Sequence, residues 1–203
     1  MKNKNKVNIV EKYFTQMNFI IFDIIAICVA GIGVIIMFMG LGLSFVAIPL
    51  MLLGALIKLG ALMFEIKDSD FLDMVNHIKE IADIDYREKV CFEQYDLSAL
   101  PIREGRDHEL RSNHLTISLF YLENPKHCVA ELYHINVKDH SFSREEFKIP
   151  YTSNVEVITE KPLVEKLTPS AYFVVEDNSE IKIPVKFGSM DLEKILEKFN
   201  EKK

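Results

Sequence analysis

The chain lacks the features on which three common classes of protein depend. Only three of its 203 residues are cysteine, an odd number that excludes a disulfide scaffold. Its formal net charge of −6 excludes a basic nucleic-acid-binding protein, and its hydrophobic fraction of 49% excludes a disordered chain. The length fits one domain of ordinary size, or a smaller domain together with a membrane segment.

Charge is scarcest within residues 19–64, where Asp23 and Lys58 are the only Asp, Glu, Lys or Arg side chains. Two apolar runs, 19–39 and 43–64, stand back to back in this segment. Each supplies the roughly 20 residues that a helix needs to cross about 30 Å of hydrocarbon. The sequence therefore predicts a two-helix transmembrane hairpin.

The two apolar runs are joined only by Gly40-Leu41-Gly42, which predicts a tight turn between antiparallel helices. A pair of buried helices in a soluble protein is the first alternative, but the length of the runs and their shortage of charge disfavour it. A cleaved signal peptide is the second alternative. A polar stretch of 18 residues before the first run, and the length of that run, argue against it.

Basic residues predict the orientation of the hairpin. The short connection carries no charge, whereas lysines flank the two ends of the hairpin: Lys2, Lys4, Lys6, Lys12 and Lys67. By the positive-inside rule, both termini lie in the cytoplasm of a multi-pass inner-membrane protein. Cys91 and Cys128 are then free thiols in a reducing compartment.

The two charged residues of the hairpin are equally far from its turn. Asp23 lies 17.5 positions before the centre of the turn and Lys58 lies 17.5 positions after it. At a rise of 1.5 Å per residue, both residues lie about 26 Å from the turn. This spacing predicts an intramembrane ion pair, with independent snorkelling of Lys58 and a proton or ion pathway as alternatives.

Residues 65–203 carry 19 Lys/Arg against 28 Asp/Glu, which predicts an acidic domain beyond the membrane. Asp68 to Asp83 has apolar residues at helical spacing, within a connecting amphipathic segment 65–88. We expect this helix to be the first packed element of the domain, and an interfacial helix is the alternative. Its acidic exposed face disfavours binding to anionic lipid.

The remainder, 89–203, reads mostly as β-strands. Strands are predicted at 89–95, 114–122, 128–137, 146–151, 155–159, 171–176 and 180–187, with a loop over 97–111 and a turn at Asp177-Asn178-Ser179. A final helix begins at Ser189, as N-cap, and carries an apolar stripe of Leu192, Ile195, Leu196 and Phe199. This order predicts an α+β domain, a mostly antiparallel small barrel or sandwich closed by its C-terminal helix.

Two stretches of this domain carry a resemblance. KIPYTSNVEVITEK (148–161) and AYFVVEDNSEIKIPVKFGSMDLEKILEKF (171–199) resemble the pleckstrin-homology-like (PH-like) domains of bacterial membrane proteins. Segment 84–112 fits that family poorly and reads as an insertion. The resemblance implies a binding or scaffold domain and supplies no catalytic residues.

No catalytic motif, metal-ligand pattern or cofactor motif is present in the sequence. The most unusual polar stretch is REGRDHELR at 103–111, which a solvated loop explains. The sharper interpretation is a loop in which Arg103, Arg106 and Arg111 face an anion such as a nucleotide, since the planar guanidinium suits such a ligand.

Three classes of function follow. The first is a non-catalytic, membrane-anchored interaction or regulatory protein, an adaptor or immunity-type protein that binds a protein partner at the cytoplasmic face. The second is a ligand-gated membrane effector whose β domain binds a small anionic ligand and drives assembly of the hairpin, which requires a homo-oligomer. The third is an enzyme whose site has no recognised motif. The first class is favoured, with no cofactor and no nucleic acid.

Overall fold

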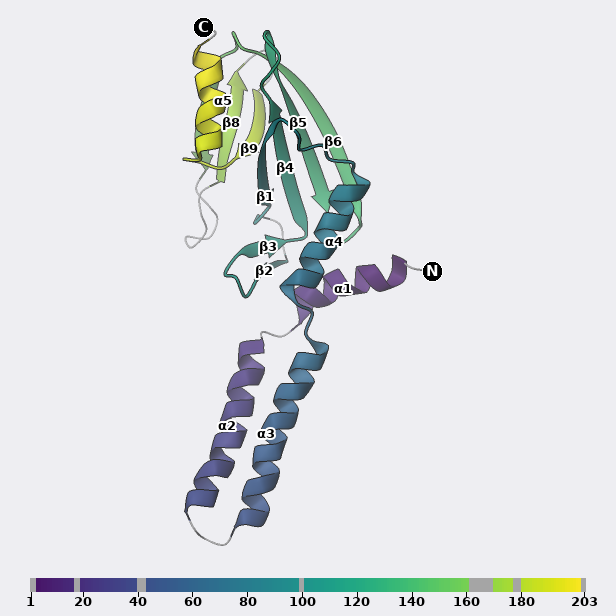
Figure 1. Ribbon diagram of the computed structural model, residues 1–203, viewed down its shortest axis with the longest axis vertical. Coiled ribbons are helices and arrows are strands. Elements are labelled where there is room, and N and C mark those ends of the chain that lie inside the picture. Colours follow the sequence, from purple (N-terminus) through teal and green to yellow (C-terminus); the bar gives the residue numbers. More distant parts are fainter. Residues whose placement is uncertain are drawn as a thin grey trace. The chain divides into compact units, whose positions relative to one another are not determined.

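The computed structural model describes residues 3–16, 19–39, 43–98, 101–160, 170–176 and 180–201 (Figure 1). The chain divides into two compact units, which we describe separately. One unit is Glu11–Phe71, and the other combines Met1–Val10 with Leu72–Lys203.

The helical unit is built on two long apolar helices. The four N-terminal helices are α1 (Asn3–Thr15), α2 (Phe19–Phe38), α3 (Ser44–Phe64) and α4 (Asp68–Ile81). Helices α2 and α3 run side by side (Figure 1), and both are long and apolar enough to cross a membrane by length and composition. The turn predicted at residues 40–42 lies outside the described residues.

Small residues allow α2 and α3 to approach closely. A Cβ atom built on Gly33 would lie 2.8 Å from the carbonyl oxygen of Ala47, and one built on Gly54 would lie 2.7 Å from that of Ala26. Ala26 and Ala47 are themselves 5% and 0% exposed. These small residues therefore pack α2 and α3 against each other.

The segments that flank the hairpin also contact each other. The Gln16 amide makes two hydrogen bonds with the backbone of Ile66, at 2.8 and 2.9 Å. The Tyr13 hydroxyl donates to Asp68 at 2.8 Å, and the Tyr13 ring stacks on Phe71 with centroids 4.5 Å apart. Segment 1–18, predicted as a cytoplasmic N-terminal segment with no assigned secondary structure, contains α1, whose C-terminal end packs against the start of α4.

The β unit contains two antiparallel meanders and a small hairpin. The first sheet has the order β1-β4-β5-β6, the second has the order β7-β8-β9, and β2 pairs with β3. The strands are β1 (Lys89–Tyr95), β2 (Ile102–Glu104), β3 (Leu110–Ser112), β4 (His114–Tyr121), β5 (His127–Asn136), β6 (Ser141–Pro150), β7 (Val155–Glu160), β8 (Ser170–Glu176) and β9 (Glu180–Val185).

A chain of aromatic rings joins both sheets to the last helix, α5 (Met190–Asn200). Phe120 on β4 lies 5.5 Å, centroid to centroid, from Phe173 on β8, which lies 5.5 Å from Phe199 on α5. Phe199 in turn lies 5.1 Å from Tyr151. Edge and tilted contacts of this kind add to the hydrophobic gain from burying the rings.

The C-terminal helix forms as predicted. The Ser189 hydroxyl accepts a hydrogen bond from the backbone N–H of Leu192, which is the expected N-cap. Leu192, Ile195 and Phe199 are buried in the core formed with both sheets. The prediction that this helix closes the β domain is confirmed.

Helix α4 is a packed element, as expected. Its residues Val75 and Ile78 are each 1% exposed. Lys79 on the same helix donates to Glu93 on β1 at 2.6 Å, so α4 lies against the first sheet on the face opposite the aromatic core.

Two details of the predicted fold were wrong, and one of its alternatives is excluded. The loop predicted over 97–111 contains the β2–β3 hairpin, and of the predicted barrel or sandwich, the described strands do not form a closed barrel. Strand β6 begins at Ser141 instead of Glu146, because backbone pairing with β5 extends through a charged segment whose side chains are exposed and show no apolar alternation. The turn predicted at 177–179 lies outside the described residues.

Candidate functional site

The hairpin brings together the two charged residues that the sequence singled out. The Lys58 ammonium donates a hydrogen bond to Asp23 Oδ1 across the two helices. The side chains are nevertheless 45% and 40% exposed, respectively. The pair therefore lies on a flank of the hairpin, beside the close contact between the helices and not within it.

The three arginines of segment 103–111 do not present three exposed guanidinium groups. Arg111 on β3 is 1% exposed, and its Nη1 donates to Asp107 Oδ1 at 2.9 Å. Arg103 is opposite Arg111 in the β2–β3 register, and Arg106 is exposed at the turn. Arg111 therefore holds the hairpin turn by binding an acid of the same segment.

The bond to Arg111 changes the titration of its partner. The hydrogen bond from the Arg111 guanidinium lowers the pKa of Asp107 from 3.8 to about 2. Near neutral pH the pair is therefore fully ionised, and an anionic ligand would have to compete with Asp107 for Arg111.

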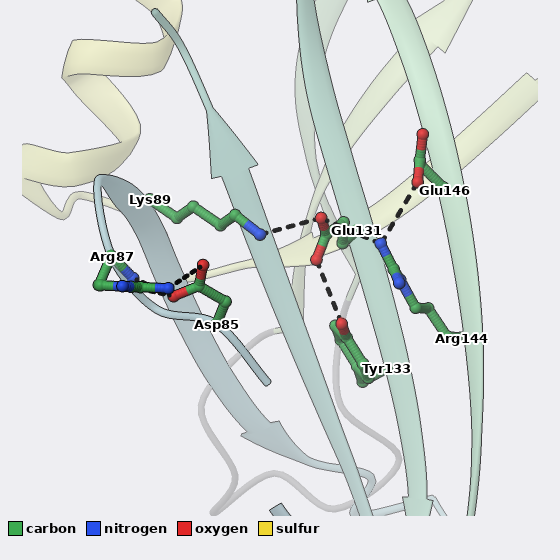
Figure 2. A network of polar contacts seen from close by, with 7 residues as sticks. All are labelled: Asp85, Arg87, Lys89, Glu131, Tyr133, Arg144 and Glu146. Carbon is green, nitrogen blue, oxygen red and sulfur yellow. Dashed lines mark hydrogen bonds and ion pairs between the residues drawn. The ribbon is translucent and has the colours of Figure 1, made fainter. Parts of the chain in front are cut away.

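A second polar cluster lies on the outer face of the first sheet, and Figure 2 shows it at close range. Glu131 on β5 is 8% exposed and accepts hydrogen bonds from Lys89 Nζ at 2.9 Å and from the Tyr133 hydroxyl at 3.2 Å. Arg144 Nη2 on β6 lies 3.2 Å from Glu131 and 3.3 Å from Glu146. We call these five residues the Glu131 cluster.

The geometry of the Glu131 cluster favours a structural role. Lys89 reaches diagonally across β4, so that a single carboxylate connects strands β1, β5 and β6. The Arg144 guanidinium also lies 5.7 Å from the centroid of the Tyr133 ring, within the range of a cation–π contact. Three donors surround Glu131, which suits a satisfied buried carboxylate better than a general base.

Sequence reasoning placed Glu131 and Tyr133 in the strand predicted at 128–137 but did not recognise this cluster. An acid between apolar residues of a buried strand is a signal that it needs a cationic partner. The sequence does not predict the cationic partners. Lys89 lies 42 positions earlier in the chain, and Arg144 lies in a segment that was predicted to precede the strand that begins at Glu146.

The two thiols of the β unit are poor nucleophiles. Burial raises the pKa of Cys128 to about 12, and burial together with the Glu93 charge raises the pKa of Cys91 to about 11. Since the thiolate is the reactive form, neither side chain is activated near neutral pH. Within the described residues, no group of three His, Cys, Asp or Glu side chains could hold a metal ion.

A polar depression opens on the first sheet, beside the start of β4, the end of β5 and the start of β6. It has a volume of about 340 Å³ and is lined by side chains that include Asp96, His114, Thr116, His134 and Ser143. Thr116 Oγ1 lies 3.4 Å from His134 Nδ1. His114 and His134 are both exposed.

Comparison with protein-family models, curated proteins and solved structures finds no match for the chain.

Proposed function

We propose that the protein is a non-catalytic interaction or regulatory protein, an adaptor or immunity-type protein, anchored in the inner membrane by the α2–α3 hairpin. The β unit then lies at the cytoplasmic face and binds a protein partner there. Both termini are cytoplasmic in this proposal, because lysines flank both ends of the hairpin whereas its turn carries no charge.

The observation that carries the anchoring proposal is the exposed apolar surface of the hairpin. Large hydrophobic side chains point outward along both helices, such as Ile27 at 70%, Phe45 at 72% and Leu56 at 63% exposed. Only 11% of the apolar window of each helix is buried within the molecule. Soluble proteins rarely expose a continuous apolar surface of this size, whereas lipid covers it without cost.

The interaction role is proposed from the architecture of the β unit. A four-strand meander, a three-strand meander and a packed terminal helix follow one another, and the last three strands and the helix are the part that resembles PH-like domains. The β2–β3 hairpin falls within the segment that reads as an insertion. We therefore assign the β unit to the PH-like class as part of the proposal, and with it a binding or scaffold role.

The polar depression favours one second candidate, a membrane effector gated by a small anionic ligand. Its volume of about 340 Å³ is at the lower end of the range for ligand pockets. His114 and His134 would supply hydrogen bonds to such a ligand. Assembly of the hairpin would then depend on the ligand.

Affinity purification from cross-linked membranes tests the proposal. We expect the tagged full chain to stay in the membrane pellet after alkaline carbonate washing and to recover one stoichiometric protein partner. Recovery of no partner, together with assembly that depends on an added nucleotide extract, would replace the first candidate by the second. Release of the chain by carbonate would contradict anchoring in both candidates.

A further inference from the structure

The flank of the hairpin that carries Asp23 and Lys58 exposes polar groups that the hydrogen bond between these two residues does not use. The two side chains bind each other, yet 40% of Asp23 and 45% of Lys58 remain exposed. Their one hydrogen bond uses one of the three N–H groups of the ammonium and one of several acceptor positions of the carboxylate. The remaining positions face whatever surrounds the hairpin.

Lipid is a poor neighbour for this polar surface. Asp23 is the fifth residue of α2 and Lys58 is the seventh from the end of α3, which places them about 6–9 Å inside the span. The long lysine side chain can extend toward the interface, but the short aspartate cannot. Charged side chains within membrane spans accordingly tend to face protein or water instead of lipid.

A second copy of this chain would meet the flank with matching charges. Two hairpins with the same orientation in one membrane are related by a two-fold axis along the membrane normal. When the flanks face each other about such an axis, α2 of each copy faces α3 of the other. Asp23 therefore faces Lys58 of the second copy, at the same depth, because the two residues lie at equal distances from the turn.

We propose that the hairpin pairs with a second copy of the chain through the flank that carries Asp23 and Lys58, so that two aspartates and two lysines form one network. An unrelated helix would need its own charges at this depth, whereas the second copy supplies them by symmetry. The inference rests on the proposed anchoring of the hairpin in a membrane.

Charge-reversal variants test pairing between copies directly. Asp23→Lys alone gives a copy with two lysines on the flank, and Lys58→Asp alone gives a copy with two aspartates. We expect each variant to be monomeric by itself, because like charges then meet. Co-expression of the two variants should restore the dimer, because every charge of one copy meets an opposite charge of the other.

The measurement is single-molecule photobleaching of the labelled full chain in bilayers of low protein density. The unmodified chain should bleach in two steps. A steric pair controls for location: Ile27, one turn from Asp23 on the same face, is 70% exposed, whereas Ile32 is 52% exposed and lies on the opposite face. Ile27→Trp should reduce two-step bleaching to the labelling background, and Ile32→Trp should leave it unchanged.

The outcomes separate this inference from the anchoring proposal. One-step bleaching of the unmodified chain while it stays in carbonate-washed membranes would overturn the inference alone. Failure of co-expression to restore two-step bleaching, or equal effects of Ile27→Trp and Ile32→Trp, would also overturn it. Release of the chain from the membrane by carbonate would overturn both proposals.

Discussion

Gly54 on α3 lies so close to Ala26 on α2 that a methyl group on the glycine would stand 2.7 Å from the Ala26 carbonyl oxygen and 2.9 Å from the Ala30 Cβ. The contact involves the backbone of the facing helix, which cannot rotate away as a side chain could. This position therefore sets the distance between the two helices of the hairpin.

The substitution Gly54→Ala should destabilise the hairpin by about 1–3 kcal/mol, because the helices must separate to admit the methyl group. Gly60→Ala is the matched control on the same helix, since nothing lies within 4 Å of a Cβ atom built there. The free energy of unfolding in mixed detergent micelles measures both effects. Equal losses in the two variants would show that Gly54 does not set the packing.

Asp23 and Lys58 should be energetically coupled. Asp23→Asn and Lys58→Met should each lower the free energy of unfolding, and the double variant should lose less than the sum by about 0.5–2 kcal/mol. Asp23→Asn combined with Lys67→Met is the control, because Lys67 lies outside the apolar helices and should show no coupling. Additive losses in the first cycle would contradict the pairing.

The Glu131 cluster of the first sheet should matter more to stability than an exposed ion pair of the second sheet. Glu131→Gln leaves Lys89 without its carboxylate partner and removes one of the two carboxylates beside Arg144, and it should cost about 2–4 kcal/mol on urea unfolding. Glu160→Gln is the control: Glu160 pairs with Lys182 at 3.4 Å, both side chains are largely exposed, and the change should stay within about 0.5 kcal/mol. Similar effects of the two substitutions would show that the cluster is not a structural clamp.

The stability of the β2–β3 hairpin should depend on pH through the ionisation of Asp107. The pKa of this carboxyl is lowered from 3.8 to about 2 by the hydrogen bond from Arg111, so the folded hairpin favours the ionised form. Its stabilisation is complete above about pH 4 and is lost as the pH falls through 2. Carbon NMR of the Asp107 carboxyl should show a midpoint near 2, and Arg111→Met should move it toward 3.8. A midpoint near 4 in the unmodified chain would contradict the bond.

The sequence predicts those parts of the molecule that rest on local patterns. Strand β1 begins and ends where the alternation of KVCFEQY predicts, and Ser189 caps α5 as the residue type predicts. The pairing of Asp23 with Lys58 could be predicted for a similar reason, because a short turn between two antiparallel helices determines which residues lie at the same distance along them.

The parts that sequence reasoning missed depend on partners distant in the chain. The first half of strand β6, from Ser141, has no apolar alternation, and pairing with β5 extends the strand through it. The C-terminal end of α1 and the residue after it contact Ile66, Asp68 and Phe71, which lie more than about 50 positions away in the chain. The Glu131 cluster draws its cations from two other strands, which no local pattern specifies.

The central claim is that α2 and α3 cross the membrane as a hairpin with the β unit in the cytoplasm. Single cysteines at Leu43, at the start of α3, and at Glu201, after α5, test it in a chain whose native cysteines are replaced by Ala or Ser. We predict that a membrane-impermeant maleimide labels Leu43→Cys in intact spheroplasts and labels Glu201→Cys only after lysis. Labelling of Glu201→Cys before lysis, or of neither position until lysis, would contradict the account.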